Sequence, residues 1–268
     1  MSEAENLQIA GLVPFSTVDW PGNLCAVLFL QGCPWRCPYC HNANILDLRT
    51  PGTVSWDEVE TLLSRRRGLL DGVVFSGGEA LVQGSASPGS RLETALKRVR
   101  ELGFRTGLHT AGAYPRRLEY LLYEGLLDWV GLDIKALPQD YELATGSSVG
   151  ADRSGETLSV LADYDASRAG GRSDFSWEVR LTLWPGLLSS RALGGEPPSS
   201  EQLLDYAREV AQWSRERGAR RFAIQRYQVP LEPQRGVDPG LLAVGPHWDE
   251  GQAEETLKDL GFLEVSIR

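Results

Sequence analysis

The apolar residues of this chain fall into short uninterrupted runs, and between the runs they recur at every third or fourth position. Uninterrupted runs of about four to eight residues are typical of strands buried on both faces. The recurring positions are typical of helices that pack one face against a core. The alternation of the two patterns predicts an α/β fold with a parallel sheet and about six strand–helix units. The predicted strands are residues 24–30, 72–76, 104–110, 129–134, 177–183 and 222–225.

The sequence signals for helices and loops differ in strength along the chain. The clearest helix start is the capping box of Ser55 and Glu58, which precedes apolar residues at helical spacing. Residues 152–169 give a weaker helical pattern. Residues 187–200 are rich in Gly, Pro and Ser, which predicts a long loop.

The two ends of the chain carry less regular patterns. Residues 1–22 are predicted to form a short lead-in, with turns at Pro14 and at Pro21-Gly22. The C-terminal extension, about residues 228–268, is predicted to hold a Pro- and Gly-rich loop, a helix and a final strand. Because no linker or repeat interrupts the pattern, residues 1–268 are expected to form a single domain.

Composition and charge exclude several classes of function. The 27 basic residues are outnumbered by 36 acidic ones, and the net charge of −9 argues against a broad nucleic-acid interface. No apolar run approaches the roughly 18–20 residues that span a membrane, and no signal peptide is visible at the N-terminus. We therefore expect a soluble cytoplasmic protein that binds neither membrane nor nucleic acid.

Three of the four cysteines lie in one loop directly after the first predicted strand. Cys33, Cys37 and Cys40 follow the spacing C-x3-C-x2-C, and thiolates are soft ligands for zinc or iron–sulfur clusters. A closed zinc site needs four ligands, but His41 is too close to Cys40, and Cys25 lies in an apolar strand as a core residue. A 4Fe-4S cluster is usually held by four cysteines, so three would leave one iron open.

This cysteine spacing, with the aromatic Tyr39 before the last cysteine, resembles the signature of the radical S-adenosylmethionine (radical SAM) superfamily. The resemblance implies a partial (β/α)6 TIM-type barrel and a 4Fe-4S cluster held by the three cysteines. It also implies that S-adenosyl-L-methionine binds the open iron and is cleaved reductively to a 5′-deoxyadenosyl radical. Tyr39 is then expected to pack near adenine.

A Gly-Gly-Glu segment follows the second predicted strand. Gly77, Gly78 and Glu79 resemble the GGE motif of the superfamily, although Ala80 stands where the family often has proline. Missing side chains let a backbone approach a ligand closely. Unpaired backbone groups and a carboxylate suit the ammonium of the methionyl group. An ordinary strand-to-helix turn is the alternative reading of an isolated Gly-Gly.

Charged residues mark the fourth and fifth predicted strands. Asp133 and Lys135 are two positions apart and are expected on one side of the chain. This D-x-K resembles the glycyl-radical-activating branch, in which the motif lies near S-adenosylmethionine. Arg180 matches that branch's arginine, expected beside the methionyl carboxylate. A charge within an apolar strand is costly unless it is paired, so a ligand partner was expected for Arg180.

His109 ends the third predicted strand, where pyruvate formate-lyase activators have an aspartate that helps to hold a monovalent cation. Histidine is a poor ligand for such a hard cation, so that cation site is in doubt. His109 is expected either to contact the cofactor or to satisfy local hydrogen bonds. The same activators carry a histidine after the sixth strand, whereas this chain has Gln225-Arg226-Tyr227.

Within the superfamily, the chain resembles compact activating proteins of glycyl-radical enzymes, and most of all the activating protein of anaerobic ribonucleoside-triphosphate reductase. Residues 11–16 and 18–22 and the pair His41-Asn42 carry this part of the resemblance. It implies a glycyl-radical enzyme as protein substrate and flavodoxin or ferredoxin as electron donor. A six-unit barrel does not close as an eight-unit one does, and a lateral opening would admit a loop of a large partner.

Two other functions remain open from the sequence. One is a radical SAM enzyme that acts on a small molecule, such as a deazapurine-forming enzyme, which the D-x-K motif disfavours. The other is a zinc-stabilised interaction module, which the missing fourth ligand disfavours.

Overall fold

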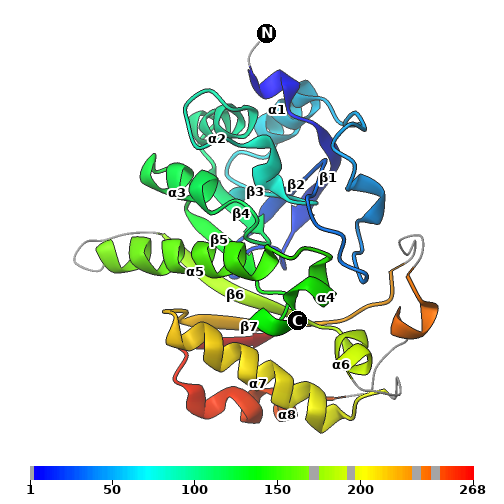
Figure 1. Ribbon diagram of the computed structural model, residues 1–268. Coiled ribbons are helices and arrows are strands. Elements are labelled where there is room, and N and C mark those ends of the chain that lie inside the picture. Colours follow the sequence, from blue (N-terminus) through cyan, green and yellow to red (C-terminus); the bar gives the residue numbers. More distant parts are fainter. Residues whose placement is uncertain (1–2, 169–174, 192–196, 231–236, 243–247) are drawn as a thin grey trace.

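The computed structural model describes residues 3–168, 175–191, 197–230, 237–242 and 248–268. Within these ranges the strands form an eight-stranded sheet in chain order. The β1–β2 pair is antiparallel, and the pairs from β2 to β8 are parallel. This is a partial TIM-type barrel, which confirms the predicted fold class (Figure 1). The strands are β1 (Ile9–Ser16), β2 (Cys25–Leu30), β3 (Gly72–Gly77), β4 (Arg105–Thr110), β5 (Trp129–Asp133), β6 (Ser176–Leu183), β7 (Arg221–Arg226) and β8 (Glu264–Ile267).

Helices connect the parallel strands and cover one face of the sheet (Figure 1). The predicted capping box is present, because Ser55 and Glu58 each bond the backbone of the other. Among the described residues, no helix has both the length and the apolar character that a membrane span requires. The helices are α1 (Trp56–Arg65), α2 (Arg91–Glu101), α3 (Pro115–Tyr123), α4 (Tyr141–Thr145), α5 (Gly150–Ser167), α6 (Pro185–Arg191), α7 (Ser200–Glu216) and α8 (Glu250–Leu257).

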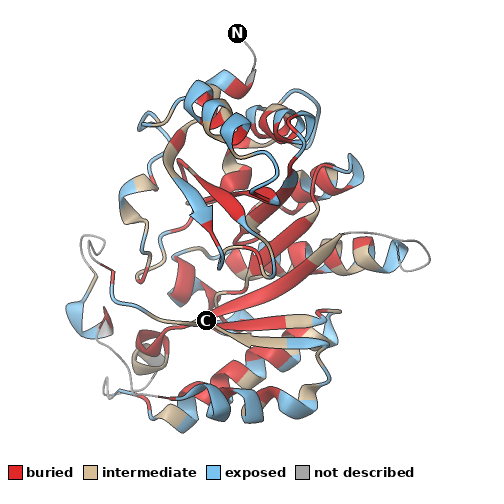
Figure 2. Ribbon diagram, turned by 180° about the vertical axis from the view of Figure 1, so that it is seen from behind, coloured by how far each residue is buried: buried red, intermediate tan, exposed pale blue. Residues whose placement is uncertain are grey.

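Alternate residues of each central strand face opposite sides of the sheet. On β2, Ala26, Leu28 and Leu30 join the large core beneath the helices. Cys25 and Val27 join a small apolar cluster on the other face, with Val74, Trp20 and Trp129. The rings of Trp20 and Trp129 stack with their centroids 5.7 Å apart. We call this cluster the barrel plug; it confirms Cys25 as a core residue, and the central strands appear mostly buried in Figure 2, whereas the strands at the edges of the sheet are more exposed.

The predicted lead-in is wrong for residues 9–16, which form β1 along the edge of β2. Proline lacks the N–H of a ladder hydrogen bond, but an edge strand tolerates it. Pro14 lies on this edge strand, where the pairing with β2 shifts register between Val13 and Ser16. The predicted turn at Pro21-Gly22 is present.

The predicted loop at residues 187–200 is also wrong in part, because α6 occupies residues 185–191. Pro185 begins that helix, and proline is well tolerated in a first helical turn. Residues 192–196 lie outside the described ranges. The helix and final strand predicted for the C-terminal extension are present as α8 and β8. Since β8 pairs with β7, this part of the extension belongs to the main sheet.

Candidate functional site

A cavity of about 410 Å³ lies at the C-terminal ends of the parallel strands, where α/β barrels place their chemistry. The loop after β2 forms one side of it, the ends of the strands from β3 onward form most of the rest, and Val18 and Asp19 after β1 also line it. Glu79 is absent from its lining, but the other predicted site residues are present. These are Cys33, Cys37, Tyr39, Cys40, Gly77, Gly78, His109, Asp133, Lys135 and Arg180.

Backbone hydrogen bonds fix the loop that carries the three cysteines. The Cys40 amide donates to the Cys37 carbonyl at 3.0 Å, and the Arg36 amide donates to the Thr145 carbonyl at 2.8 Å. The Arg36 guanidinium also donates to the Cys33 carbonyl at 2.7 Å. The loop is thereby held so that all three cysteines line one cavity.

Burial keeps these three thiols neutral in the absence of a bound metal. It raises the pKa of Cys33 to about 12 and the pKa of Cys37 to about 11, and it also raises the pKa of Cys40. A thiolate is stable here only if a nearby positive charge replaces the lost hydration. Bound iron would supply that charge, because metal binding deprotonates cysteine ligands.

The donor set fits a 4Fe-4S cluster with one open iron. As the side chains stand, the described residues form no group of three or more His, Cys, Asp or Glu that could hold a metal ion. The fourth cysteine, Cys25, is fully buried in the barrel plug. Three soft thiol ligands around one cavity match an iron–sulfur cluster in chemistry. The assignment of Cys33, Cys37 and Cys40 as iron ligands therefore stays a prediction that the donor chemistry supports.

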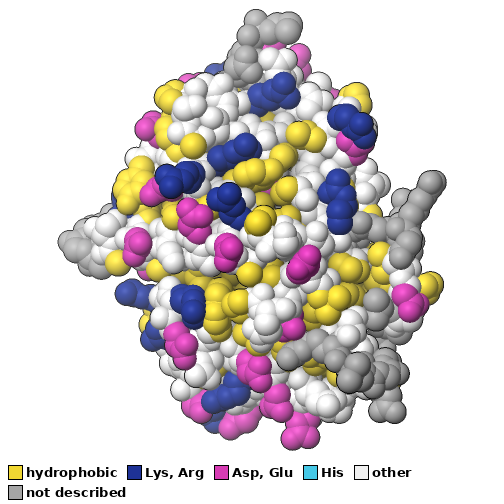
Figure 3. Space-filling model, in the orientation of Figure 1, with side chains coloured by type: hydrophobic (Ala, Val, Ile, Leu, Met, Phe, Trp, Pro, Cys, Tyr) yellow, Lys and Arg dark blue, Asp and Glu magenta, His cyan; other side chains and the backbone are white. Residues whose placement is uncertain are grey.

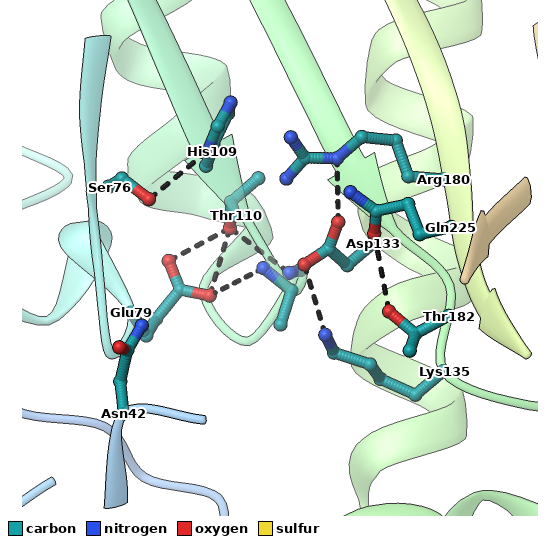
Figure 4. A network of polar contacts seen from close by, with 12 residues as sticks. Asn42, Ser76, Glu79, His109, Thr110, Asp133, Lys135, Arg180, Thr182 and Gln225 are labelled. Atoms are coloured by element: carbon teal, nitrogen blue, oxygen red, sulfur yellow. Dashed lines mark hydrogen bonds and ion pairs between the residues drawn. The ribbon is translucent and has the colours of Figure 1, made fainter. Parts of the chain in front are cut away.

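A mostly buried charge cluster lies at the ends of β5 and β6, with Arg180 buried and Asp133 and Lys135 partly exposed. Asp133 accepts a hydrogen bond from Arg180 Nε at 2.7 Å and another from Lys135 Nζ at 3.0 Å (Figure 4). Burial alone would raise the pKa of Asp133, but the charges of Arg180 and Lys135 hold that pKa well below its usual range. Arg180, whose side chain is 5% exposed, thus has a protein partner in addition to any ligand. All three side chains line the cavity.

The two glycines of the Gly-Gly-Glu segment allow β3 to end close against the cysteine loop. Gly77 has a φ of 125°, which favours glycine, and a Cβ at this position would overlap the backbone of Leu30. A Cβ at Gly78 would overlap the carbonyl oxygen of Gly32, next to Cys33. Glycine is therefore needed at both positions so that the end of β3 can pack directly against the backbone at the end of β2.

The Glu79 carboxylate is used inside the protein. It accepts hydrogen bonds from Thr110 Oγ1 at 2.8 Å and from the Ala111 amide at 2.9 Å, and the residue is 1% exposed. Burial raises its pKa, and these bonds oppose that rise. The predicted contact between Glu79 and the methionyl ammonium does not agree with this geometry. Glu79 instead fixes the turn that follows β4.

His109 satisfies local hydrogen bonds, the second of the two roles expected for it. Its Nε2 lies 2.8 Å from the Asp19 carbonyl oxygen, which can only accept, so Nε2 carries the proton. Nδ1 then accepts from the Ser76 hydroxyl at 3.0 Å. Both ring nitrogens are thus engaged within the protein, while the ring still lines the cavity.

Acid is expected to destabilise the fold through His109. Burial, together with the charge of Arg180, lowers the pKa of His109 from 6.5 to about 3. As the pH falls below 6.5, the unfolded chain takes up a proton that the folded chain does not bind, so stability falls between pH 6.5 and 3. Between pH 7.5 and 5.5 this costs about 1.4 kcal/mol of unfolding free energy. Urea unfolding of iron-free wild type and of His109→Gln at pH 7.5 and at pH 5.5 checks this. Between the two pH values the unfolding free energy of the variant should fall by about 1.4 kcal/mol less than that of wild type. Equal falls in the two proteins would contradict a neutral, buried His109.

Tyr39 brings an unsatisfied hydroxyl to the cavity wall. The residue is 4% exposed, and its ring packs against Trp184 with the centroids 4.8 Å apart. Its Oη is buried and has no hydrogen-bond partner in the described part of the chain. An unpaired buried hydroxyl is costly, so a polar ligand in the cavity would stabilise it. This agrees with a bound cofactor at Tyr39, although the predicted adenine contact stays a prediction.

The sequence interpretation missed several polar residues of the cavity that lie on β6, β7 and after β8. Thr182 is paired in register with Gln225, and its hydroxyl donates to the Gln225 side chain at 3.2 Å. Arg268 makes two bonds to the buried Glu178, at 2.8 and 2.7 Å. Glu178 and Thr182 are each two positions from Arg180 on one strand, so strand parity could have identified them.

Sequence comparison finds relatives that are named as activating enzymes. It is 35% identical over 147 residues to a pyruvate formate-lyase-activating enzyme of Clostridium pasteurianum, which covers 52% of this chain and 57% of that protein. It is 34% identical over 137 residues to a Methanocaldococcus jannaschii protein whose name places it among glycyl-radical enzyme activating enzymes. That match covers 50% of this chain and 52% of that protein. The chain therefore spans about half the length of the curated relatives it matches.

Comparison with solved structures supports the fold. Streptococcus suis SuiB bound to S-adenosylmethionine superposes with a TM-score of 0.56 and 13% identity, covering 89% of this chain and 48% of that one. At this level of identity the likeness concerns the fold alone. In sequence, the family model described as the Radical SAM superfamily matches residues 27–168, more than half of the chain, and includes the three loop cysteines. The chain belongs to the radical SAM superfamily.

Proposed function

We propose that this protein is a radical SAM oxidoreductase that activates a glycyl-radical enzyme, and that residues 1–268 form a single radical SAM domain. The partner that the sequence favours is anaerobic ribonucleoside-triphosphate reductase, acting in the cytoplasm. When bound, the 4Fe-4S cluster and S-adenosyl-L-methionine supply reductive cleavage to a 5′-deoxyadenosyl radical, which removes hydrogen from a backbone glycine. The names of the two curated relatives agree with this activity.

One observation carries the proposal: the three loop cysteines and the Asp133 charge cluster line the same cavity. The cysteines hold the cluster at one side. Arg180, positioned by Asp133, presents its guanidinium for the methionyl carboxylate, and guanidinium binds carboxylate well. The backbone at Gly77 and Gly78 would contact the ammonium group and Tyr39 would pack near adenine, since these residues line the same cavity.

A protein substrate suits the surface beside the cavity. Val13, Phe15 and Val18 are exposed by 36%, 49% and 68%, and Val18 also lines the cavity. Clustered exposed apolar side chains at an active-site mouth are typical of protein contacts. They lie on or just after the edge strand β1, so a partner loop that carries the target glycine would pass over β1 to reach the cofactor.

The test is transfer of hydrogen from a partner protein. The reduced, iron-loaded protein is mixed anaerobically with S-adenosyl-L-methionine and candidate glycyl-radical enzymes. Electron paramagnetic resonance should then show the doublet of a glycyl radical. With deuterated glycine in the partner, label should appear in 5′-deoxyadenosine. Label that comes only from a small metabolite, and from no partner or partner peptide, would reject the activator function in favour of a small-molecule radical SAM enzyme.

A further inference from the structure

A second cavity, of about 500 Å³, lies next to the cysteine loop and is lined by three arginines. No Asp or Glu is among its lining residues. The chain as a whole is acidic, with a net charge of −9, so this basic hollow is local. Figure 3 shows Lys and Arg side chains gathered over α2 and α3, whereas Asp and Glu side chains lie along α5. The lining residues are Pro34, Trp35, Ala86, Ala113, Tyr114, Pro115, Arg116, Arg117, Ser147, Val149 and Arg153.

The arginines differ in how firmly they are held. Arg117 is anchored: its guanidinium donates to the Leu81 carbonyl at 2.8 Å and lies 4.1 Å from the centre of the Tyr114 ring. Arg116 and Arg153 are exposed, on the first turns of α3 and α5. Arg153 makes one long ion pair, 3.5 Å, with an exposed glutamate on its own helix. The cavity is thus lined by one anchored arginine, Arg117, and by two exposed ones, Arg116 and Arg153.

The two helix ends add to the positive potential. α3 and α5 both begin at this cavity, and neither has a side-chain cap at its N-terminus. The unpaired N–H groups at a helix N-terminus carry partial positive charge. The three arginines therefore supply most of the positive charge, because Asp152 in the first turn of α5 offsets that helix end and α3 begins with a proline. Guanidinium groups gathered in one hollow are the chemistry that binds carboxylate or phosphate groups.

The second cavity and the cysteine cavity share one lining residue, Trp35. Trp35 lies between Cys33 and Cys37 in the sequence and lines both cavities. The Arg36 amide bonds the Thr145 carbonyl, which ties the cysteine loop to the segment that leads into α5. A partner seated in the arginine-lined cavity would therefore contact the loop that holds the proposed cluster ligands.

We propose that this cavity is the docking site of an acidic one-electron carrier protein. The proposal rests on the proposed function, because it requires a cluster on Cys33, Cys37 and Cys40. In the step, the reduced carrier loses one electron and the oxidised cluster gains it, and no bond is made or broken. Charge complementarity selects an acidic partner, because like charge elsewhere on this protein repels it. Because Trp35 lines both cavities, a carrier docked here would lie against the loop whose cysteines would hold the cluster.

The experiment compares Arg116→Glu/Arg153→Glu with wild type and with Arg67→Glu. Arg117 is left in place because of its backbone contacts. Arg67 is exposed and precedes β3, so it lies at the opposite end of the strands from both cavities. Reduction of the loaded cluster by reduced flavodoxin, used as the acidic carrier, is followed by stopped-flow absorbance at several salt concentrations. A parallel arm uses photoreduced 5-deazaflavin, a small neutral reductant. Binding of oxidised flavodoxin to each iron-free protein is measured by calorimetry.

The double variant should be reduced by flavodoxin about tenfold more slowly at low salt, with a weaker salt dependence, and should bind flavodoxin more weakly. Deazaflavin should reduce the double variant as fast as it reduces wild type. The Arg67→Glu variant should match wild type in its rates of reduction by both flavodoxin and deazaflavin. Unchanged flavodoxin rates and binding in the double variant would overturn the docking site. A cluster that even deazaflavin cannot reduce in wild type would overturn the proposed function and the docking site with it. Thermal stabilisation of wild type alone by inorganic phosphate, with unchanged flavodoxin rates, would make the cavity a small-anion site instead.

Discussion

Replacing Cys37 by alanine is expected to lower the iron content of anaerobically purified protein from about four atoms per chain to near zero. Cys33, Cys37 and Cys40 line one cavity, and the described residues offer no preformed alternative group of ligands. With two thiols left, the cluster has lost one of three anchors and lies open to solvent. Iron and sulfide analysis, with the visible absorption of the cluster, measures the outcome.

Cys25→Ala is the matched control, because it removes a thiol outside the cavity. Cys25 is fully buried in the barrel plug, and burial raises the pKa of its thiol to about 12. This variant should keep its iron while losing some thermal stability, because it leaves a small void in a packed cluster. Loss of iron in the Cys25 variant, or full iron in the Cys37 variant, would contradict a cluster held by the three loop cysteines.

Asp133→Asn is expected to weaken the binding of S-adenosyl-L-methionine roughly 30-fold or more while the iron content is kept. The carboxylate accepts bonds from both Arg180 and Lys135. Asparagine carries no charge, so it would no longer neutralise these two cations in a cavity that takes a positively charged sulfonium ligand, and it would hold Arg180 less firmly for the methionyl carboxylate. Removing one partner of a buried charge pair costs about 2 kcal/mol or more, which sets the size of the effect. Anaerobic equilibrium dialysis on the loaded protein measures the affinity.

Asp71→Asn is the matched control, because it removes one carboxylate that lies away from the cavity. Asp71 precedes β3, at the end of the strands away from the cavity, and accepts a hydrogen bond from the Leu24 amide at 2.8 Å. This variant should bind S-adenosyl-L-methionine as wild type does. If Asp133→Asn lost its cluster as well as its affinity, and melted far below the control, Asp133 would have a folding role in place of a cofactor-binding one.

Much of the fold was predictable, because its signals are local. The uninterrupted apolar run before Cys33 and the capping box at Ser55 each depend on neighbouring residues, and both features are present. The edge strand β1 was not predictable in the same way. Pro14 indicates a turn when it is considered alone, and only the position of the strand at the sheet edge makes it acceptable.

The candidate site was predictable as a set of residues but not as a set of contacts. The end of each parallel strand could be read from the sequence, and so the cysteine loop and Asp133 could be assigned to one edge of the sheet. The pairing of Asp133 with Arg180 depends on register between β5 and β6, which no local pattern encodes. The sequence also could not indicate that the carboxylate of Glu79 binds Thr110 rather than a ligand.

The bond between Glu178 and Arg268 joins residues 90 positions apart. Of the bonds that shape the cysteine loop, those from Cys40 to Cys37 and from Arg36 to Cys33 span three positions, whereas the bond from the Arg36 amide to the Thr145 carbonyl joins residues far apart in the chain. Closing a long stretch of chain costs more entropy than closing a short turn, and nonlocal pairings form late and slowly. The local bonds therefore give the cysteine loop its turns, but the Thr145 bond can hold the loop in place only when the segment before α5 is packed beside it. The position of the three cysteines around one cavity is thus a property of the assembled barrel, and a short peptide with the same C-x3-C-x2-C sequence would lack it.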